Sequence, residues 1–502
     1  MASQIKPKEL KAFQQAQVLL SQNNAQAAKD TLLAYSRKNK TGLDTKFLLC
    51  MCNAILGNFQ EAIEPATLLV KQQAKNIEYL KLLGSLYHSL KKYEQAIPLF
   101  ERALKINSGD FQTLSNIGSS LIEIKKYDEA ESYLKKSLAI QPNQPDALTN
   151  YGLLLQANTK LDDAINLHKK ALQYSPDHNT ALYNLAFALN EKGEFEASIN
   201  NYLKVLNTSP NHVRALCDIA YVYGKLKQPE KSLPYLQRAH SIDPNDAHIH
   251  LISGTIHKLM DNLPEAENSF KEAVRLNPDD QTAKYHLAII SGNNTMTSSP
   301  DKYVENLFDG YAETFDEHLT GKLKYKTPEL INDMVQKHID NTKKHKLLDL
   351  GCGTGLAGTY LKDISDYMVG IDLSSKMLKK AEQRNLYDEL IATGIEQYYE
   401  AHEFRPDIVV SADVFVYIGD IANIFKETAQ ALEDNGLFVF STEDTQDTDE
   451  FMLKESGRFA HNENYIASLA DTYGLNLIDK QKTIIRYDAD KPIHGQVYLL
   501  KK

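Results

Sequence analysis

The sequence predicts a two-domain protein, in which a stack of helical hairpins precedes an α/β domain with a doubly wound sheet. The first observation is a pattern of small residues that recurs every 34 residues, without insertion, through the first half of the chain. The second is a change after Ser291, where short apolar runs alternate with helical stretches, as in a sheet covered by helices. The third is a glycine-rich turn after the first of these runs, at the edge where such sheets bind ligands.

The repeating pattern predicts two closely packed helices per unit, because small residues let helices approach and a proline ends the second helix. Position eight of successive units is Gly84, Gly118, Gly152, Ala186, Ala220 and Gly254; twelve residues later stand Ala96, Ala130, Ala164, Ser198, Ser232 and Ala266; the prolines are Pro142, Pro176, Pro210, Pro244 and Pro278. Such a hairpin cannot bury its apolar face alone and has to stack on neighbours. Six clear units end near residue 280, and two weaker ones precede them in phase.

This pattern resembles the tetratricopeptide repeat. The resemblance implies a superhelix of about eight repeats over residues 9–280, and a protein or peptide bound in its groove. Residues 281–300 are expected to form a capping helix and a linker, with the helical segment 282–291 as a solvating end cap.

Position six of successive units is the candidate peptide-binding surface. The residues there are Asn116, Asn150, Asn184 and Asp218, and repeats in phase place them in a row. A carboxamide both donates and accepts, so a row of them can pair with an extended peptide backbone. The row resembles the asparagine ladder of O-linked N-acetylglucosamine transferase. The alternative is that asparagine, which is common at this position of tetratricopeptide repeats, serves the packing of the repeat itself.

Residues 301–502 are expected to form the α/β domain. Strands are predicted at 346–350, 367–372, 406–412 and 436–442, with 388–391 leading into another and with 482–487 and 496–500 at the end. The turn after the first strand contains Gly351, Gly353 and Gly355, which permit tight turning and close approach of a ligand. Asp372 ends the next strand, 23 residues after Asp349, where an acid accepts from ribose hydroxyls.

This segment resembles motif I and the following acidic strand of class I methyltransferases, which use S-adenosylmethionine. The dinucleotide fingerprint, in contrast, needs its third glycine where this chain has Leu356. The resemblance implies S-adenosylmethionine as cofactor, held by Asp349, Gly351, Cys352, Gly353, Gly355, Asp372, Leu373, Met377, Tyr311, Thr393, Gly394 and Ala412. The alternative is a generic Rossmann-like turn or an inactive nucleotide site. With both halves in this order, the chain resembles bacterial proteins described as predicted methyltransferases with tetratricopeptide repeats.

Two parts of the cofactor site admit more than one interpretation. In the family, an aromatic residue of an N-terminal lid helix covers the methionine part of the cofactor, and Tyr311 is the candidate. The alternative is that Tyr311 and Phe315, four residues apart, pack one helix face. Many relatives hold the adenine amino group with an Asp after the third strand, where this chain has Thr393 and Gly394. Adenine is then held by backbone groups or by Glu396.

The candidate catalytic residues follow the fourth and fifth strands. They are Asp413, Tyr417 and His461. Asp413 is placed to orient or deprotonate an acceptor, or alternatively to cap a helix. His461 is a candidate general base with a structural alternative, and Arg458 is a candidate to hold a carboxylate. The Asn/Asp-Pro-Pro-aromatic sequence of nucleobase and glutamine-amide methyltransferases is absent after the fourth strand, which argues against those acceptors.

Composition narrows the partners. The formal charge of −10 argues against a nucleic-acid backbone as partner, and no apolar run is long enough to span a bilayer. The four cysteines match neither a zinc site nor a disulfide framework, so we expect no metal and a reducing, cytoplasmic location.

The sequence thus predicts an S-adenosylmethionine-dependent methyltransferase that acts on a protein recruited by its repeats. In the expected reaction the activated methyl is displaced in line, and the protein aligns the acceptor and excludes water. The alternatives are a small-molecule methyltransferase, on a quinone or secondary metabolite, whose repeats hold partner proteins, and a scaffold that binds the cofactor without turnover.

Overall fold

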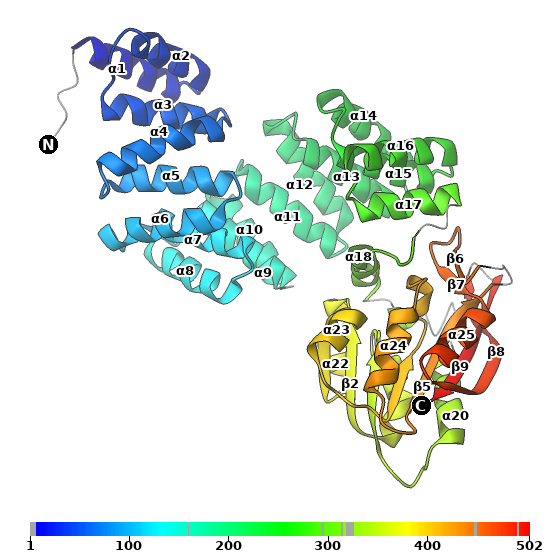
Figure 1. Cartoon of the computed structure of the whole chain (residues 1–502). Helices are drawn as coiled ribbons and strands as arrows, with labels where there is room; N and C mark the ends of the chain where they lie inside the picture. Colours follow the sequence, from blue (N-terminus) through cyan, green and yellow to red (C-terminus); the bar gives the residue numbers. More distant parts are fainter. Residues whose placement is uncertain are drawn as a thin grey trace. The chain divides into compact units, whose positions relative to one another are not determined.

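The computed structural model describes residues 7–158, 160–292, 296–312, 315–317, 326–445, 449–488 and 491–502. The chain divides into two compact units, Met1–Leu226 and Lys227–Lys502 (Figure 1). This division falls inside the predicted repeat region. None of the helices in the described residues is long and apolar enough to cross a membrane.

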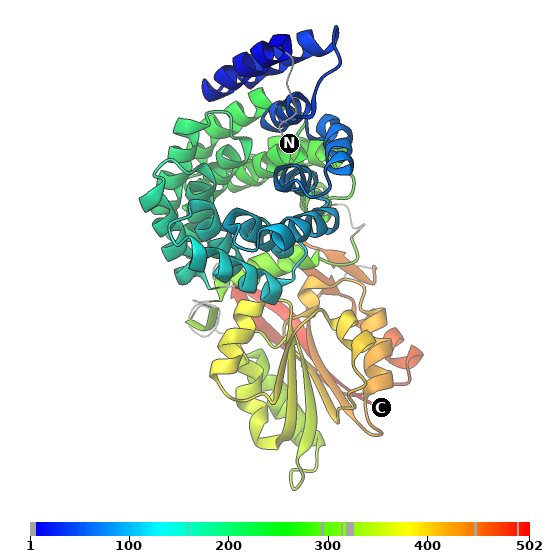
Figure 2. The same cartoon turned by 90° about the vertical axis from the view of Figure 1, so that its left-hand side faces the viewer.

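The first unit consists of helices, and all but the last of those described pair with a neighbour into hairpins along the chain (Figures 1 and 2). They are α1 (Pro7–Ser21), α2 (Ala25–Ser36), α3 (Leu43–Ile55), α4 (Phe59–Gln72), α5 (Ile77–Ser89), α6 (Tyr93–Ile106), α7 (Phe111–Glu123), α8 (Tyr127–Ile140), α9 (Pro145–Ala157), α10 (Leu161–Tyr174), α11 (Asn179–Glu191), α12 (Phe195–Thr208) and α13 (Val213–Lys225).

The small residue at position eight is required by the second helix of the same hairpin. A Cβ atom added at Gly84 would lie 2.6 Å from Phe100 Cε1, and one at Gly118 would lie 2.6 Å from Leu134 Cγ. These distances are shorter than any ordinary carbon contact, so the large side chain of the second helix fills the space that the glycine leaves. The prolines end the second helices as predicted: Pro142 and Pro176 each follow the last residue of their helix, Ile140 or Tyr174, by two positions.

The second unit begins with further helices and continues into the sheet domain. The helices are η1 (Pro229–Ser232), α14 (Leu233–Ile242), α15 (Ala247–Leu259), α16 (Leu263–Leu276) and α17 (Gln281–Ser291).

Helix α17 is not the solvating end cap that the sequence predicts. Its apolar residues Tyr285, Ala288 and Ile289 are buried against Leu453 and Phe459 of the sheet domain. The Tyr285 hydroxyl donates a hydrogen bond to the carbonyl of Gly457. The prediction was wrong because the partner of this apolar face lies some 170 residues further along the chain, where local periodicity carries no signal.

The linker after α17 is also built into the domain. The Thr297 carbonyl accepts from the N–H groups of Gly419 and Asp420, both at 2.8 Å, and the Ser299 N–H donates to the Tyr417 carbonyl at 2.8 Å. The last part of the predicted linker therefore pairs with the segment that follows the fourth strand.

The sheet has a parallel core with an antiparallel edge. Its strands are β1 (His345–Leu350), β2 (Ser365–Asp372), β3 (Glu389–Ala392), β4 (Ile408–Ser411), β5 (Leu437–Asp444), β6 (Phe451–Leu453), β7 (Phe459–His461), β8 (Asn476–Asp488) and β9 (Lys491–Lys501). Strands β3-β2-β1-β4-β5 run parallel in that order, and β9 pairs with β5 antiparallel and carries β8. The hairpin β6–β7, which the sequence did not indicate, joins the end of β5 through β7.

Helices cover both faces of this sheet (Figure 2). The helices of this domain are α18 (Asp301–Tyr311), α19 (Phe315–Glu317), α20 (Thr327–His338), α21 (Leu356–Leu361), η3 (Lys362–Ile364), α22 (Ser375–Gln383), α23 (Ile395–Ala401), η4 (Phe415–Tyr417), α24 (Ala422–Ala431) and α25 (Glu463–Thr472). In β1, Leu348 packs in a core with Phe425 of α24, whereas Leu347 packs in another with Met334 of α20. Alternate residues of one strand thus serve two layers, and the predicted doubly wound fold is confirmed.

Candidate functional site

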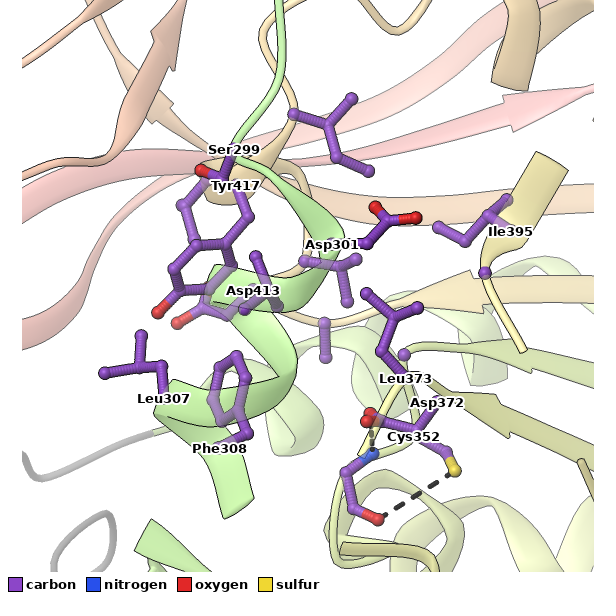
Figure 3. Close-up of a pocket in the computed structure, with 18 of the residues that line it drawn as sticks. Ser299, Asp301, Leu307, Phe308, Cys352, Asp372, Leu373, Ile395, Asp413 and Tyr417 are labelled. Carbon is purple, nitrogen blue, oxygen red and sulfur yellow. Dashed lines mark hydrogen bonds between the residues drawn. The ribbon is translucent and has the colours of Figure 1, made fainter. Parts of the chain in front are cut away.

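A cavity of about 640 Å³ lies at the carboxyl ends of β1, β2 and β4. Its wall combines the glycine-rich turn, the starts of the loops after these strands, α18, the linker residues 297–299 and the turn before β7. Figure 3 shows Asp372, Leu373 and Cys352 on one side of it, with Phe308, Asp413 and Tyr417 on another. This is the position at which open α/β sheets bind ligands.

The glycine-rich turn has the backbone conformation that glycine favours. Gly351 and Gly353 have φ values of 69° and 56°. A Cβ atom at Gly351 would lie 2.4 Å from Val414 Cγ2, whereas one at Gly353 would meet only Phe315, at 3.9 Å. Gly351 is therefore needed for packing, and the space beside Gly353 is open.

Asp372 joins the end of β2 to this turn. Its Oδ2 accepts from the Gly353 N–H at 2.9 Å and its Oδ1 accepts from the Ser374 N–H at 2.8 Å (Figure 3). Burial raises the pKa of this carboxyl to about 6, although the two N–H groups favour its charged form. The pair fixes the carboxylate at the rim of the cavity.

Asp349 presents a buried acceptor. Its Oδ2 accepts from the Tyr387 hydroxyl at 2.7 Å, but its Oδ1 has no hydrogen-bond partner among the described residues. Burial raises the pKa of Asp349 to about 7; the Tyr387 hydrogen bond opposes this shift and the charge of Asp372 adds to it. Because unpaired buried acceptors are costly, a donor from a bound ligand would stabilise this atom.

Tyr387 was not among the predicted site residues. Its ring lies against Gly355, Gly358 and Gly370, where added Cβ atoms would come within 2.7–2.9 Å of Tyr387 atoms. Three glycines from the turn, α21 and β2 thus form a slot that holds the hydroxyl on Asp349. The glycines were visible in the sequence, but only the fold brings them to one tyrosine.

Helix α18, the predicted lid, contributes residues to the lining of the cavity. Tyr311 lines the cavity and is 46% exposed. The aromatic pair on this segment is Phe308 with Phe315, at 5.8 Å between ring centroids, and Phe308 also contacts Tyr417 at 5.3 Å. Asp309 accepts from the Ser374 hydroxyl at 2.5 Å, which ties α18 to the start of α22.

Most of the predicted cofactor residues meet at the cavity. Those that line it are Asp349, Gly351, Cys352, Gly353, Asp372, Leu373, Tyr311, Thr393, Gly394 and Ala412. Gly355 and Met377 do not line it: Gly355 faces Tyr387, and Met377, on α22, is fully buried. Glu396 lines the cavity as well, and its Oε1 accepts from Asn423 Nδ2 at 2.9 Å.

Asp413 is held in place by two other strands. It has a φ of 58°, and its Oδ1 accepts from the Ser441 hydroxyl at 2.9 Å. Its Oδ2 pairs with Arg486 Nη1 at 3.2 Å, and Arg486 also pairs with Glu443. Burial raises the pKa of Asp413, while Arg486 lowers it. The carboxylate therefore does not cap the following helix; it lines the cavity as part of a buried ion-pair network.

His461 does not reach the cavity. It is fully buried on β7, and its Nε2 donates to the carbonyls of Ile418 and Gly419, both at 3.0 Å. Burial lowers its pKa to about 4. This arrangement favours the structural alternative over the predicted general base. Tyr417, by contrast, lines the cavity.

The comparisons with known proteins agree with this geometry. A family model described as a methyltransferase domain matches residues 348–440, from β1 into β5. Tetratricopeptide repeat models match residues 77–110, 109–177, 155–217 and 213–246. This chain combines tetratricopeptide repeats with a methyltransferase domain.

Curated proteins resemble about a fifth to a quarter of this chain. An uncharacterized protein of Haemophilus influenzae is 33% identical over 129 residues, which is 23% of this chain and 51% of that protein. The ubiquinone biosynthesis O-methyltransferase of Pelagibacter ubique is 26% identical over 126 residues, covering 24% of this chain and 52% of the relative. That of Thiobacillus denitrificans is 32% identical over 104 residues, covering 19% and 44%. The chain spans about half the length of the curated relatives it matches.

The repeats place the four predicted peptide-binding residues on successive first helices. Asn116, Asn150, Asn184 and Asp218 lie on α7, α9, α11 and α13, and all are half-buried. Asn150 Nδ2 donates to the Ser115 hydroxyl of the preceding repeat at 3.0 Å, and Asp218 Oδ2 accepts from the Tyr183 hydroxyl at 2.7 Å. These two residues therefore also bridge neighbouring repeats. No side-chain hydrogen bond of Asn116 or Asn184 is present within the described residues.

Proposed function

We propose that this chain transfers a methyl group from S-adenosylmethionine to an acceptor in the cavity, and that its repeats recruit the polypeptide that carries the acceptor. The observation that carries the proposal is the carboxylate of Asp372, held by the Gly353 and Ser374 N–H groups beside an open glycine turn. The orphaned Asp349 Oδ1 supports it, because it is a buried acceptor in the same wall.

The residues present fit this cofactor. The half-buried Asp372 carboxylate suits ribose hydroxyls, and Leu373 and Ile395 offer an apolar surface for a base. Thr393 and Gly394 line the same side and offer backbone groups to adenine. When bound, S-adenosylmethionine supplies a methyl group that is already activated by the positive sulfur.

The chain's own residues then have to orient the acceptor and exclude water. Phe308 and Tyr417 contribute aromatic surface to the cavity, which α18 also lines, so they are placed to exclude water. Asp413 is fixed by Ser441 and Arg486, so it is a rigid group against which an acceptor is aligned. Removal of a proton, where the acceptor carries one, falls to Asp413 or Tyr417 in this proposal.

Recruitment is supported by the repeats and by the two asparagines that retain their hydrogen-bonding capacity. A peptide backbone beside Asn116 and Asn184 would find both a donor and an acceptor on each. The second candidate is a small-molecule methyltransferase, which is favoured by the relatives named as ubiquinone biosynthesis O-methyltransferases.

The test is to incubate the full chain with methyl-labelled S-adenosylmethionine and host lysate, and to separate labelled protein from labelled small molecules. We expect label in a protein band. Asn116→Ala with Asn184→Ala should raise the KM for that protein roughly 30-fold with kcat retained, because two hydrogen bonds of about 1 kcal/mol each are lost in ground and transition state alike.

Two controls separate recruitment from packing. Asn207→Ala, on an exposed position of α12, should leave KM unchanged. Asn150→Ala should lower the melting temperature as well, because it removes the bond to Ser115. Label confined to small molecules would contradict recruitment, and no label in any fraction would contradict methyl transfer.

A further inference from the structure

Two arginines line the cavity, and they differ in whether they pair with a carboxylate. Arg486, on β8, is 3% exposed and pairs with Asp413 and Glu443. Lys454 pairs with Glu443 as well, at 3.1 Å. Arg458, in the turn between β6 and β7, lines the same cavity and is half-buried, yet it forms no ion pair with a carboxylate of the described residues. Arg486 and Lys454 thus pair with the carboxylates of Asp413 and Glu443, and Arg458 pairs with neither of them.

The turn that carries Arg458 is fixed on both sides. The Lys454 N–H donates to the Arg458 carbonyl at 2.8 Å, and the preceding Gly457 has a φ of 74°. The Tyr285 hydroxyl of α17 donates to the Gly457 carbonyl and accepts from the Ser299 hydroxyl at 2.9 Å. The guanidinium therefore stands on a braced turn rather than on a free loop.

The guanidinium stays charged in this position. Burial opposes the charge, but the neighbouring Tyr417, Glu443 and Asp413 outweigh burial and raise the pKa of Arg458. Asp301 and Asp420 also line the cavity, and Asp420 already accepts from the Tyr465 hydroxyl at 3.0 Å. A partly exposed, permanently charged group beside the β4 end attracts an anion and repels an ammonium or a guanidinium.

We propose that the acceptor is a carboxylate held by Arg458, and that the product is a methyl ester. A carboxylate matches the planar fork of a guanidinium, and one of its oxygens can bind while the other reacts. It is also ionised at neutral pH and needs no general base. This suits a cavity whose described lining contains neither histidine nor lysine, and in which Asp413 is engaged by Arg486.

The reaction balances without a further reagent. A carboxylate oxygen forms a bond to the methyl carbon while the carbon–sulfur bond breaks, and the electron pair of that bond remains on sulfur. The positive charge of the sulfonium and the negative charge of the carboxylate are both neutralised. The products are the methyl ester and S-adenosylhomocysteine, and no proton is released.

This inference rests on the proposed function, and one experiment separates the two. The full chain is incubated with methyl-labelled S-adenosylmethionine and host lysate, and the protein and small-molecule fractions are treated with mild alkali. A methyl ester hydrolyses to volatile labelled methanol, whereas methyl groups on nitrogen, sulfur or ether oxygen stay bound. We expect volatile label; the fraction that releases it distinguishes a polypeptide carboxylate from a free acid.

Variants assign the carboxylate to Arg458. Arg458→Gln should lower kcat/KM for the alkali-labile product roughly 10- to 100-fold, with Arg458→Lys in between, while calorimetric affinity for S-adenosylmethionine stays the same. Arg405→Gln, at an exposed position of the same unit, is the matched control.

Each remaining outcome overturns the inference. Alkali-stable label would contradict the ester and leave methyl transfer intact. Labile label that is insensitive to Arg458→Gln would contradict the role of Arg458. Loss of cofactor affinity in Arg458→Gln would show that this arginine holds the cofactor instead. No label at all would contradict the proposed function and this inference together.

Discussion

The repeats and the methyltransferase domain differ in how far along the chain their decisive contacts reach. In the repeats, Gly84 meets Phe100 and Gly118 meets Leu134 within one hairpin. In the domain, Asp349 is bonded by Tyr387, 38 residues away, and Asp413 by Arg486, 73 residues away. The packing of the repeats is therefore local and can be predicted from the sequence pattern. The site of the other domain depends on the sheet, which brings residues together that are distant in the sequence.

The largest effect on stability is expected at position eight of the repeats, where the local packing can be broken by one substitution. Gly118→Ala places a Cβ atom 2.6 Å from Leu134 Cγ, so the second helix has to move. We expect a loss of about 1–3 kcal/mol in the free energy of unfolding, despite the better helix propensity of alanine. Denaturant unfolding measures it. Cofactor affinity should be unaffected, because the cavity lining contains no residue of this repeat; a stabilised variant would contradict the packing.

The next effect concerns how the affinity of the domain for its cofactor depends on pH. Burial raises the pKa of Asp349 to about 7 and of Asp372 to about 6, above the usual value for an aspartate. If S-adenosylmethionine requires ionised Asp372, its affinity should fall about tenfold between pH 7 and pH 5, since only the charged fraction binds. Calorimetry at several pH values tests this.

The stability of the free protein should change with pH in the opposite direction to the cofactor affinity, and should fall as pH rises. A carboxyl whose folded-state pKa is raised binds its proton more tightly when folded, so its contribution to stability is lost as pH rises from about 4 to about 7. Asp372→Asn should remove the part of both trends that belongs to Asp372. A cofactor affinity that is flat from pH 5 to pH 8 would contradict the role of this carboxylate.

The smallest effect is expected where the repeat carries alanine instead of glycine. Ala186 is fully buried at position eight, and by the repeat register Tyr202 occupies the place of Phe100. Ala186→Gly should cost about 0.5–1 kcal/mol, because glycine weakens a helix interior. The melting temperature should therefore fall in both this variant and Gly118→Ala, and it should fall less in this variant. A rise for Ala186→Gly would show that the position eight residues are not matched to their hairpins.

The same difference in reach explains which predictions the structure bears out. The register of small residues and prolines predicts the hairpins, and apolar runs predict the strands that carry the glycine turn and Asp372. The hairpin β6–β7 was missed because its strands are three residues each, too short for a periodic signal. The roles of His461 and Tyr387 could not be predicted from spacing. The hydrogen bond of His461 to the Gly419 carbonyl, and the packing of Tyr387 against three glycines, arise only when the chain is folded.

Binding of S-adenosylmethionine to the full chain tests the central claim most directly. Isothermal calorimetry on the unmodified protein should show one site, and Gly353→Arg should abolish it, because the arginine side chain would fill the open space beside the turn. Asp372→Ala should weaken binding strongly, and circular dichroism should show that both variants keep their helices. Binding that survives Gly353→Arg in a folded protein, or that is indifferent to Asp372→Ala, would contradict the account.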